Sequence, residues 1–341
     1  MGDVQYLGEN PPVFFRIIPY SITRYTGTVS LISLTLVLQW SYIGSFMKPD
    51  RERQGEFLIL LQALLWSLFP VITILSYGRL PPLISFGWST FLAALFFGGV
   101  LTLRHRWGEI MDRSSLKNIL WATFFLGILY YCLVFLGLRY TSAGNASLIA
   151  STEMFFSFAF FHVWRKDFIS PKHILGAVFM LIGVLIVLYP NTTKLHLGDL
   201  LILMATLIAP LGNYFQQKAR QTVSSEMILF VRSSISTPIV LILAHLFKER
   251  ASLTDLKSSA VFILINGLLL LGFSKILWVE GIHRISVTKS NALSSIEPPL
   301  TLLFAWLILH NIPTQFQLLS VVPIFSGMVL LSMDKSPAPR T

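Results

Sequence analysis

The sequence predicts an all-α integral membrane protein with ten transmembrane helices, arranged as two inverted five-helix repeats. The chain is 54% hydrophobic and 12% charged, whereas soluble domains average about 25% charged residues. Ten stretches are apolar enough to cross a bilayer, which takes about 20 residues in a helix. The second half of the chain also matches the first at a constant offset of 144 positions. These three observations favour a duplicated membrane protein.

The first repeat is predicted over residues 57–193 and contains five spans. Charged residues separate these spans, and only the fourth contains an acidic side chain, Glu153. The five spans are 57–76, 80–103, 118–138, 140–164 and 173–193.

The second repeat is predicted over residues 198–333 and also contains five spans. Its three middle spans each contain one charged residue, namely Arg232, Lys275 and Glu297. The five spans are 200–217, 227–247, 258–279, 290–309 and 316–333.

The offset of 144 positions holds without a gap over most of the two halves. Identical pairs run from Ile84 and Ile228 to Gly183 and Gly327. Scattered identities between apolar segments arise by chance, but a single register across both halves favours duplication. Because each repeat has an odd number of helices, the second enters the membrane from the opposite side. Inverted repeats place a substrate site near the membrane midplane, where the halves meet.

The distribution of basic residues predicts that both ends of the ten-helix core face the cytoplasm. With that orientation, the inner side carries 16 Lys and Arg residues and the outer side carries 6, in agreement with the positive-inside rule. The net charge of +10 follows from short inner loops, so no nucleic-acid partner is expected. We expect a multi-pass protein of the plasma membrane or cell inner membrane.

Residues 1–46 have no counterpart in the second half. They include an uncharged run at 25–47 that contains Gln39 and several Ser and Thr residues. This segment could be an extra anchoring helix, a signal-like segment, or upstream sequence before a true start at Met47. No clear cleavage motif follows the run, which disfavours a removable signal. We favour the start at Met47.

Two acidic residues deep in apolar spans are the main candidates for a functional site. Glu153 and Glu297 are aligned by the repeat, and a carboxylate in lipid is costly unless it faces a protein interior or a water-filled path. Ser290 and Ser294 would share a helical face with Glu297. The serines could contact substrate or only allow close helix packing. The glutamates could serve transport, form a structural ion pair, or remain protonated and hydrogen-bonded.

Arg232, Lys275 and Trp66 complete the candidate substrate path. The two basic residues lie about one and a half turns from the predicted cytoplasmic ends of their spans, so they could line the path or extend to the membrane surface. Either cation could pair with a glutamate. Trp66 and its aligned partner Pro210 lie midway along the first helix of each repeat. The tryptophan could pack in the core or face the path, and the proline could form a hinge.

Several sequence segments resemble a known family. They are Leu-Leu-Trp-Ser-Leu-Phe-Pro at 64–70, the stretch at 140–153 that ends in Ser-Thr-Glu, and Ser-Ile-Glu-Pro-Pro at 295–299. Together with the repeat, they resemble the EamA-type branch of the drug/metabolite transporter superfamily over roughly 57–333. The resemblance implies transport of small metabolites, often export of amino acids or related compounds. Residues 165–167 and 310–311 depart from the family's usual Gly-Glu, and Trp88 stands where the second repeat has Arg232.

The sequence favours a carrier over an enzyme or a channel. Its seven histidines are dispersed, and it has no His-Glu-x-x-His or Gly-rich phosphate loop. It also lacks the filter-like segments of a channel. We therefore expect alternating-access transport of a small molecule, without catalytic residues, cofactor or metal. Gly183 and Gly327 could pack within one protomer or between two, so a homodimer is compatible with the sequence.

Overall fold

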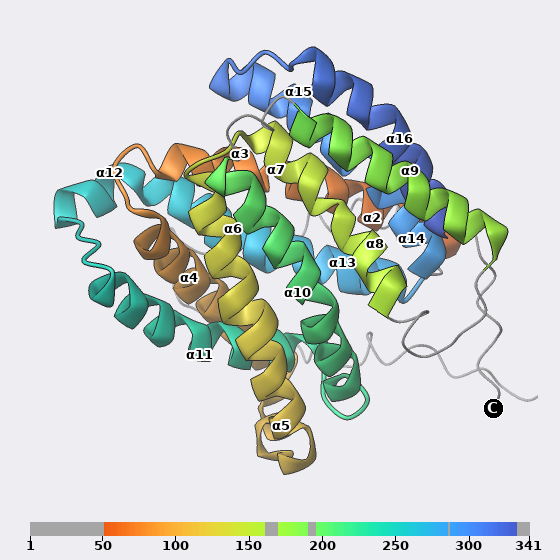
Figure 1. Ribbon diagram of the computed structural model, residues 1–341. Helices are drawn as coiled ribbons and strands as arrows, with labels where there is room; N and C mark the ends of the chain where they lie inside the picture. Colours follow the sequence, from red (N-terminus) through yellow and green to blue (C-terminus); the bar gives the residue numbers. More distant parts are fainter. Residues whose placement is uncertain (1–50, 161–169, 190–195, 286, 333–341) are drawn as a thin grey trace, which may run out of the picture. The chain divides into compact units, whose positions relative to one another are not determined.

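The computed structural model describes residues 51–160, 170–189, 196–285 and 287–332, and the elements in these ranges are all helices (Figure 1). The prediction of an all-α chain is therefore confirmed over these residues. The N-terminal segment 1–46, with its proposed start at Met47, lies outside them.

Each half of the chain contains long helices and several short ones joined end to end. In the first half these are α2 (Arg51–Ser67), α3 (Phe69–Ser76), α4 (Pro82–Leu103), η2 (Trp107–Met111), α5 (Arg113–Ala122), η3 (Thr123–Tyr130), α6 (Tyr131–Leu138), α7 (Ala143–Ala150), α8 (Thr152–Phe158) and α9 (Pro171–Leu188). In the second half they are α10 (Leu197–Ala219), α11 (Ser225–Leu246), α12 (Leu253–Leu264), η6 (Ile265–Phe273), α13 (Ser274–Ile282), α14 (Val287–Ser294), α15 (Glu297–Leu309) and α16 (Gln315–Ser332).

Nine helices in the described ranges are long and apolar enough to cross a membrane. They correspond to nine of the ten predicted spans. The remaining span, predicted at 140–164, is divided into α7 and α8, and its last predicted residues, 161–164, lie outside the described part of the chain. The third span of each half contains a π-helix, η3 in the first half and η6 in the second.

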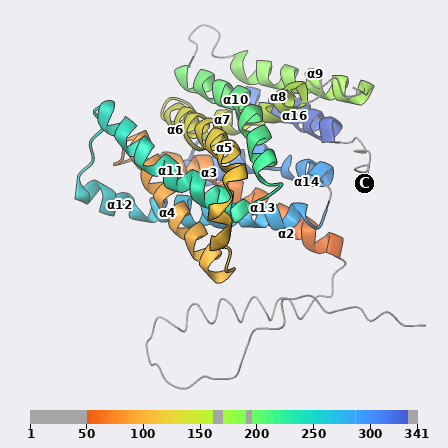
Figure 2. The same ribbon diagram turned by 90° about the horizontal axis from the view of Figure 1, so that it is seen from below.

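The fifth and last spans, α9 and α16, lie side by side (Figures 1 and 2). Glycines permit this close approach, because a Cβ atom at Gly327 would lie 2.7 Å from the carbonyl oxygen of Gly176, and one at Gly183 would meet Ile324. Small residues allow helices in a membrane to pack backbone against backbone. Gly183 and Gly327 therefore pack within one protomer.

A second close pair consists of α4 and α11, and acidic side chains connect these helices at both ends. At one end, Oε2 of Glu249 accepts hydrogen bonds from the backbone N–H groups of Leu83 (3.0 Å) and Ile84 (3.1 Å) in the first turn of α4. At the other end, Glu109 accepts one from the N–H of Ser224, just before α11 (2.7 Å). The first N–H groups of a helix lack partners within it. The loop after each helix thus caps the start of the other.

Ion pairs also join the two halves at the predicted inner face. Arg104, at the end of α4, pairs with Glu226 at the start of α11 and with Glu280 of α13 (3.1 Å). Lys289 of α14 pairs with Glu52 of α2. The Glu226 side chain is only 4% exposed, so its pairing with Arg104 offsets the cost of burying a charge.

Candidate functional site

The two glutamates singled out by the repeat lie at helix interruptions. In the first half, Ser151 separates α7 from α8, and Glu153 is in the first turn of α8. In the second half, Ser295 and Ile296 separate α14 from α15, and Glu297 is the first residue of α15. The first turn of a helix carries a partial positive charge, which stabilises a carboxylate there. Both interruptions therefore provide a favourable position for an acidic side chain inside the membrane.

Local sequence explains why the helices are interrupted at these places. The hydroxyl groups of Thr152 and Ser295 donate to backbone carbonyl groups of Ile149 and Ala292, at 2.6 Å in both cases. Such bonds satisfy carbonyl groups that lose their helical partners. In the second half, the two prolines that follow Glu297 are favoured at the start of a helix, since they lack the N–H group that an interior position requires.

Other spans are irregular as well. Leu68 separates α2 from α3 in the first span, and Pro210 lies inside α10, the first span of the second half. The third spans of the two halves contain the π-helices η3 and η6. Interrupted helices and π-helical turns are frequent at functional sites and at the substrate sites of transporters. The interruptions thus fall in corresponding spans of both halves.

Each glutamate contacts an amide side chain from the opposite half. Asn213 of α10 donates to Oε1 of Glu153 at 2.9 Å, and the Tyr130 hydroxyl group lies 3.5 Å from Oε2. The Gln62 side chain of α2 lies against the Glu297 carboxylate. Asn213 and Gln62 lie on the first spans of their halves, so the two contacts join corresponding spans, although the two amide residues are not aligned by the repeat. Each joins a carboxylate of one half to the first helix of the other.

The two basic residues point into the protein and contact neutral groups. Nζ of Lys275 lies 3.2 Å from the ring centroid of Trp66, which is about 22 Å of helical rise from the start of α2 at Arg51. Nη1 of Arg232 donates to Oε1 of Gln216 at 2.8 Å. The structure therefore directs Lys275 toward the interior rather than toward the membrane surface.

Four charged groups thus lie close enough to interact without forming direct pairs. Lys275 interacts electrostatically with Glu297, Arg232 and Glu153. Within the described residues, however, no ion pair joins either glutamate to Lys275 or Arg232. This arrangement differs from the structural ion pair that the sequence left open.

The two predicted serines lie on α14, before the interruption. Ser290 is fully buried and Ser294 is 8% exposed, and the Ser294 hydroxyl group has no hydrogen-bond partner among the described residues. The helical face that the sequence predicted for Ser290, Ser294 and Glu297 includes the turn at Ser295 and Ile296, which separates α14 from α15. α14 packs against α2 and α16.

Sequence reasoning missed the neutral partners of the charged groups. Their only signal in the sequence was that an uncharged polar residue lies within an apolar span. The residues are Gln62, Asn213, Gln216 and Tyr130. The repeat does not reveal them, because the position aligned with Asn213 is Phe69.

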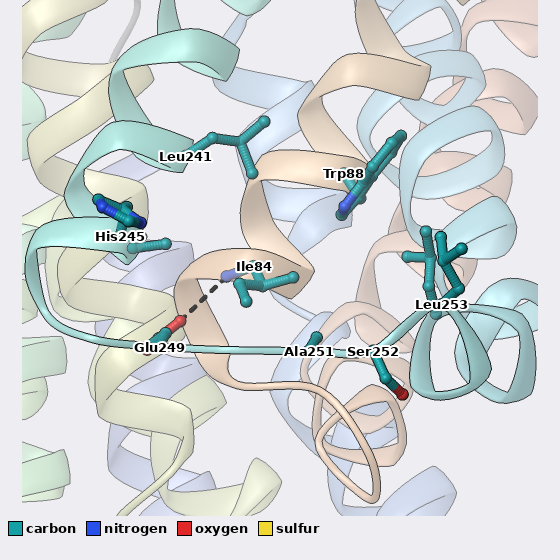
Figure 3. Close-up of a pocket in the computed structure, with 10 residues that line it drawn as sticks. Ile84, Trp88, Leu241, His245, Glu249, Ala251, Ser252 and Leu253 are labelled. Carbon is teal, nitrogen blue, oxygen red and sulfur yellow. Dashed lines mark hydrogen bonds between the residues drawn. The ribbon is translucent and has the colours of Figure 1, made fainter.

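A separate pocket lies between α4, α11 and the start of α12. Its lining includes Trp88, Leu241, His245 and Glu249, and the hydrogen bond from Ile84 to Glu249 borders it (Figure 3). The seven residues predicted for the substrate path are not part of its lining. The candidate site at the interrupted helices rests on the contacts of Glu153 and Lys275 described above.

Comparison with known proteins identifies the chain's relatives. The model of the EamA-like transporter family matches residues 53–189 and again residues 196–333. The uncharacterized transporter YoaV of Bacillus subtilis (strain 168) is 21% identical over 271 residues, which cover 78% of this chain and 92% of that protein. The uncharacterized transporter YyaM of the same organism is 26% identical over 273 residues, covering 75% and 86%.

A solved crystal structure shares the fold. It matches with a TM-score of 0.62 and 16% sequence identity, and the match covers 82% of this chain and 97% of that chain. At this identity the likeness concerns the fold alone.

Proposed function

Because this chain belongs to the EamA-like transporter family and is a multi-pass membrane transporter, we propose that it exports small metabolites, such as amino acids or related compounds, by alternating access. The proposed location is the plasma membrane or cell inner membrane. The family match covers both halves of the chain, including the spans that contain Glu153 and Glu297.

The observation that carries this proposal is the pair of contacts between a carboxylate of one half and an amide of the other. Glu153 with Asn213, and Glu297 with Gln62, lie at interruptions in corresponding spans. If the halves rock against each other, both contacts must change together. A solute that binds between the halves would then contact these charged groups. The partners of the groups would differ between the outward-open and the inward-open state.

The ion pairs at the predicted inner face fit the same mechanism. Arg104 with Glu226, and Lys289 with Glu52, join the two halves there. We propose that these pairs separate when the site opens to the cytoplasm and form again when it opens outward. Breaking the exposed pair of Lys289 with Glu52 costs little free energy. Separating Arg104 from the buried Glu226 costs about 3–5 kcal/mol if the carboxylate stays buried, so this pair opens only when water reaches Glu226.

Flux through reconstituted vesicles tests the proposal. Vesicles that contain the full-length protein are loaded with a mixture of labelled amino acids, and the release of each is compared with that from protein-free vesicles. A carrier gives saturable release and exchange of label against unlabelled solute added outside. Release that does not saturate would indicate a channel, and a changed compound without translocation would indicate a membrane enzyme. Either result would refute the proposal.

A further inference from the structure

The ammonium group of Lys275 occupies the face of an aromatic ring inside the membrane. Its Nζ atom lies 3.2 Å from the ring centroid of Trp66. Trp66 is itself stacked on Phe69, with ring centroids 4.7 Å apart and planes 2° apart. The face of a tryptophan ring attracts a cation, and the attraction is stronger when both groups are shielded from water. The stacked rings therefore form a binding position for an ammonium group.

Lys275 takes this position although two carboxylates lie within its electrostatic reach. Lys275 interacts with Glu297 and Glu153, yet the ion pairs found among the described residues do not include it. Its flexible four-carbon stem gives the ammonium group a choice of partners. Arg232 differs, because its guanidinium group is held by Gln216.

Lys275 lies close to a π-helical segment. It is the second residue of α13 and follows directly on the π-helix η6. A π-helical turn changes the helical register locally and is typical of functional sites. A small shift at this junction would move the stem of Lys275 between Trp66 and the glutamates.

We propose that Lys275 is a tethered competitor for an ammonium group of the substrate. In the empty carrier, the lysine ammonium occupies the face of Trp66. A substrate with a primary ammonium group next to an apolar moiety displaces it, and Lys275 then pairs with Glu297 or Glu153. The exchange leaves one cation on the ring and adds one ion pair. The inference rests on the proposed transport site and adds the chemical class of its substrate.

Binding to the purified full-length protein in detergent tests this inference separately from transport. The probes are 2-phenylethylamine, a primary ammonium beside an aromatic ring, and 3-phenylpropionate, an anion of similar shape. Titration calorimetry gives their affinities for the wild type and for Lys275→Gln. We expect Lys275→Gln to bind the amine more tightly, by up to about tenfold or 1.4 kcal/mol, because the amine no longer has to displace the lysine from the ring. Binding of the anion should not improve.

Three further variants separate competition at the ring from other effects. Arg232→Gln removes an equal charge from the same interior but leaves Lys275 on the Trp66 ring, so it should increase the affinity for the amine much less. Trp66→Leu should abolish the gain when combined with Lys275→Gln. Lys218→Gln is the matched control, because Lys218 also lies over an aromatic ring, that of Tyr214, at 4.5 Å. Lys275→Met, of similar length, replaces Lys275→Gln if the latter does not fold.

Several outcomes would overturn the inference. Unchanged or weaker amine binding by Lys275→Gln would show that the lysine does not compete. An equal gain in Arg232→Gln would show a general charge effect. Failure of the amine to bind any of the proteins would refute an ammonium subsite. Saturable flux of some other solute would still support the proposed function, so the two failures are distinguishable.

Discussion

Replacing Gly327 by alanine places a methyl group where α9 and α16 cross. The new Cβ atom would lie 2.7 Å from the carbonyl oxygen of Gly176 and 2.9 Å from the backbone nitrogen of Met180. Because both are backbone atoms, a side-chain rotation cannot relieve the contact. The helices would have to separate by about 0.7 Å to restore an ordinary van der Waals contact.

The expected cost follows from two opposing terms. Overpacking a close contact costs about 1–3 kcal/mol, and alanine in a helix recovers up to about 1 kcal/mol relative to glycine. We therefore expect Gly327→Ala to lower the free energy of unfolding by about 1–2 kcal/mol. Unfolding of the purified protein in detergent micelles, followed by circular dichroism during titration with a denaturing detergent, measures this change.

Gly99 of α4 provides a matched control. A Cβ atom there would meet nothing within 4 Å, so Gly99→Ala should leave stability unchanged or raise it by up to about 1 kcal/mol. Light scattering on Gly327→Ala should give the same molar mass as the wild type, because the contact lies within one protomer. The reasoning fails if Gly327→Ala is as stable as Gly99→Ala, or if its main effect is dissociation of an oligomer.

Three further predictions concern charge. Glu297→Gln should strongly reduce flux at normal membrane expression and change its pH dependence, because an amide cannot exchange a proton. Glu153→Gln should do so less, and wild-type flux and pH profiles in both variants would make the two glutamates structural. Burial raises the pKa of Glu249 above its ordinary value of 4.5 although the N–H groups of Ile84 and Leu83 oppose this shift, so its stabilising contribution is complete below pH 4.5 and is lost as the pH rises through the raised pKa. Thermal unfolding measured between about pH 4 and 8 should show that the stability of Glu249→Gln depends less on pH than that of the wild type. The same pH dependence in both proteins would contradict the raised pKa of Glu249. Reporter fusions after residue 335 and within residues 104–117 should be cytoplasmic, and one within 248–257 should be external; an external signal from 104–117 would contradict the inverted topology.

The sequence predicted the spans and the equivalence of the glutamates because both depend on simple physical properties. A membrane span requires a long apolar run, and nine such runs are helices in the described part of the chain. The constant offset identified Glu153 and Glu297 as equivalent, and both lie in the first turn after an interruption. The free-energy cost of a carboxylate in lipid and the repetition of a pattern along the chain both follow from residue types alone.

The interruptions and the neutral partners could not be predicted because they depend on tertiary contacts. The Thr152 hydroxyl group bonds to a backbone carbonyl group where the helix is interrupted. A threonine can also lie within a continuous helix, so the residue type alone does not predict an interruption. From the sequence, the side chain of Lys275 could extend to the membrane surface or line the path, and only the position of Trp66 shows that it points inward. The direction in which a long side chain points depends on packing between segments that are distant in the sequence.

The reciprocal capping of α4 and α11 has a consequence for biogenesis. When α4 enters the membrane, the acceptor for the N–H group of Leu83 has not been synthesised, since Glu249 follows 166 residues later. The first half supplies Glu109 in advance for the start of α11. In a chain that ends after the first half, the first N–H groups of α4 lack this acceptor and have to be satisfied by water or other groups. The cap at the start of α4 is therefore completed only after the second half has been translated.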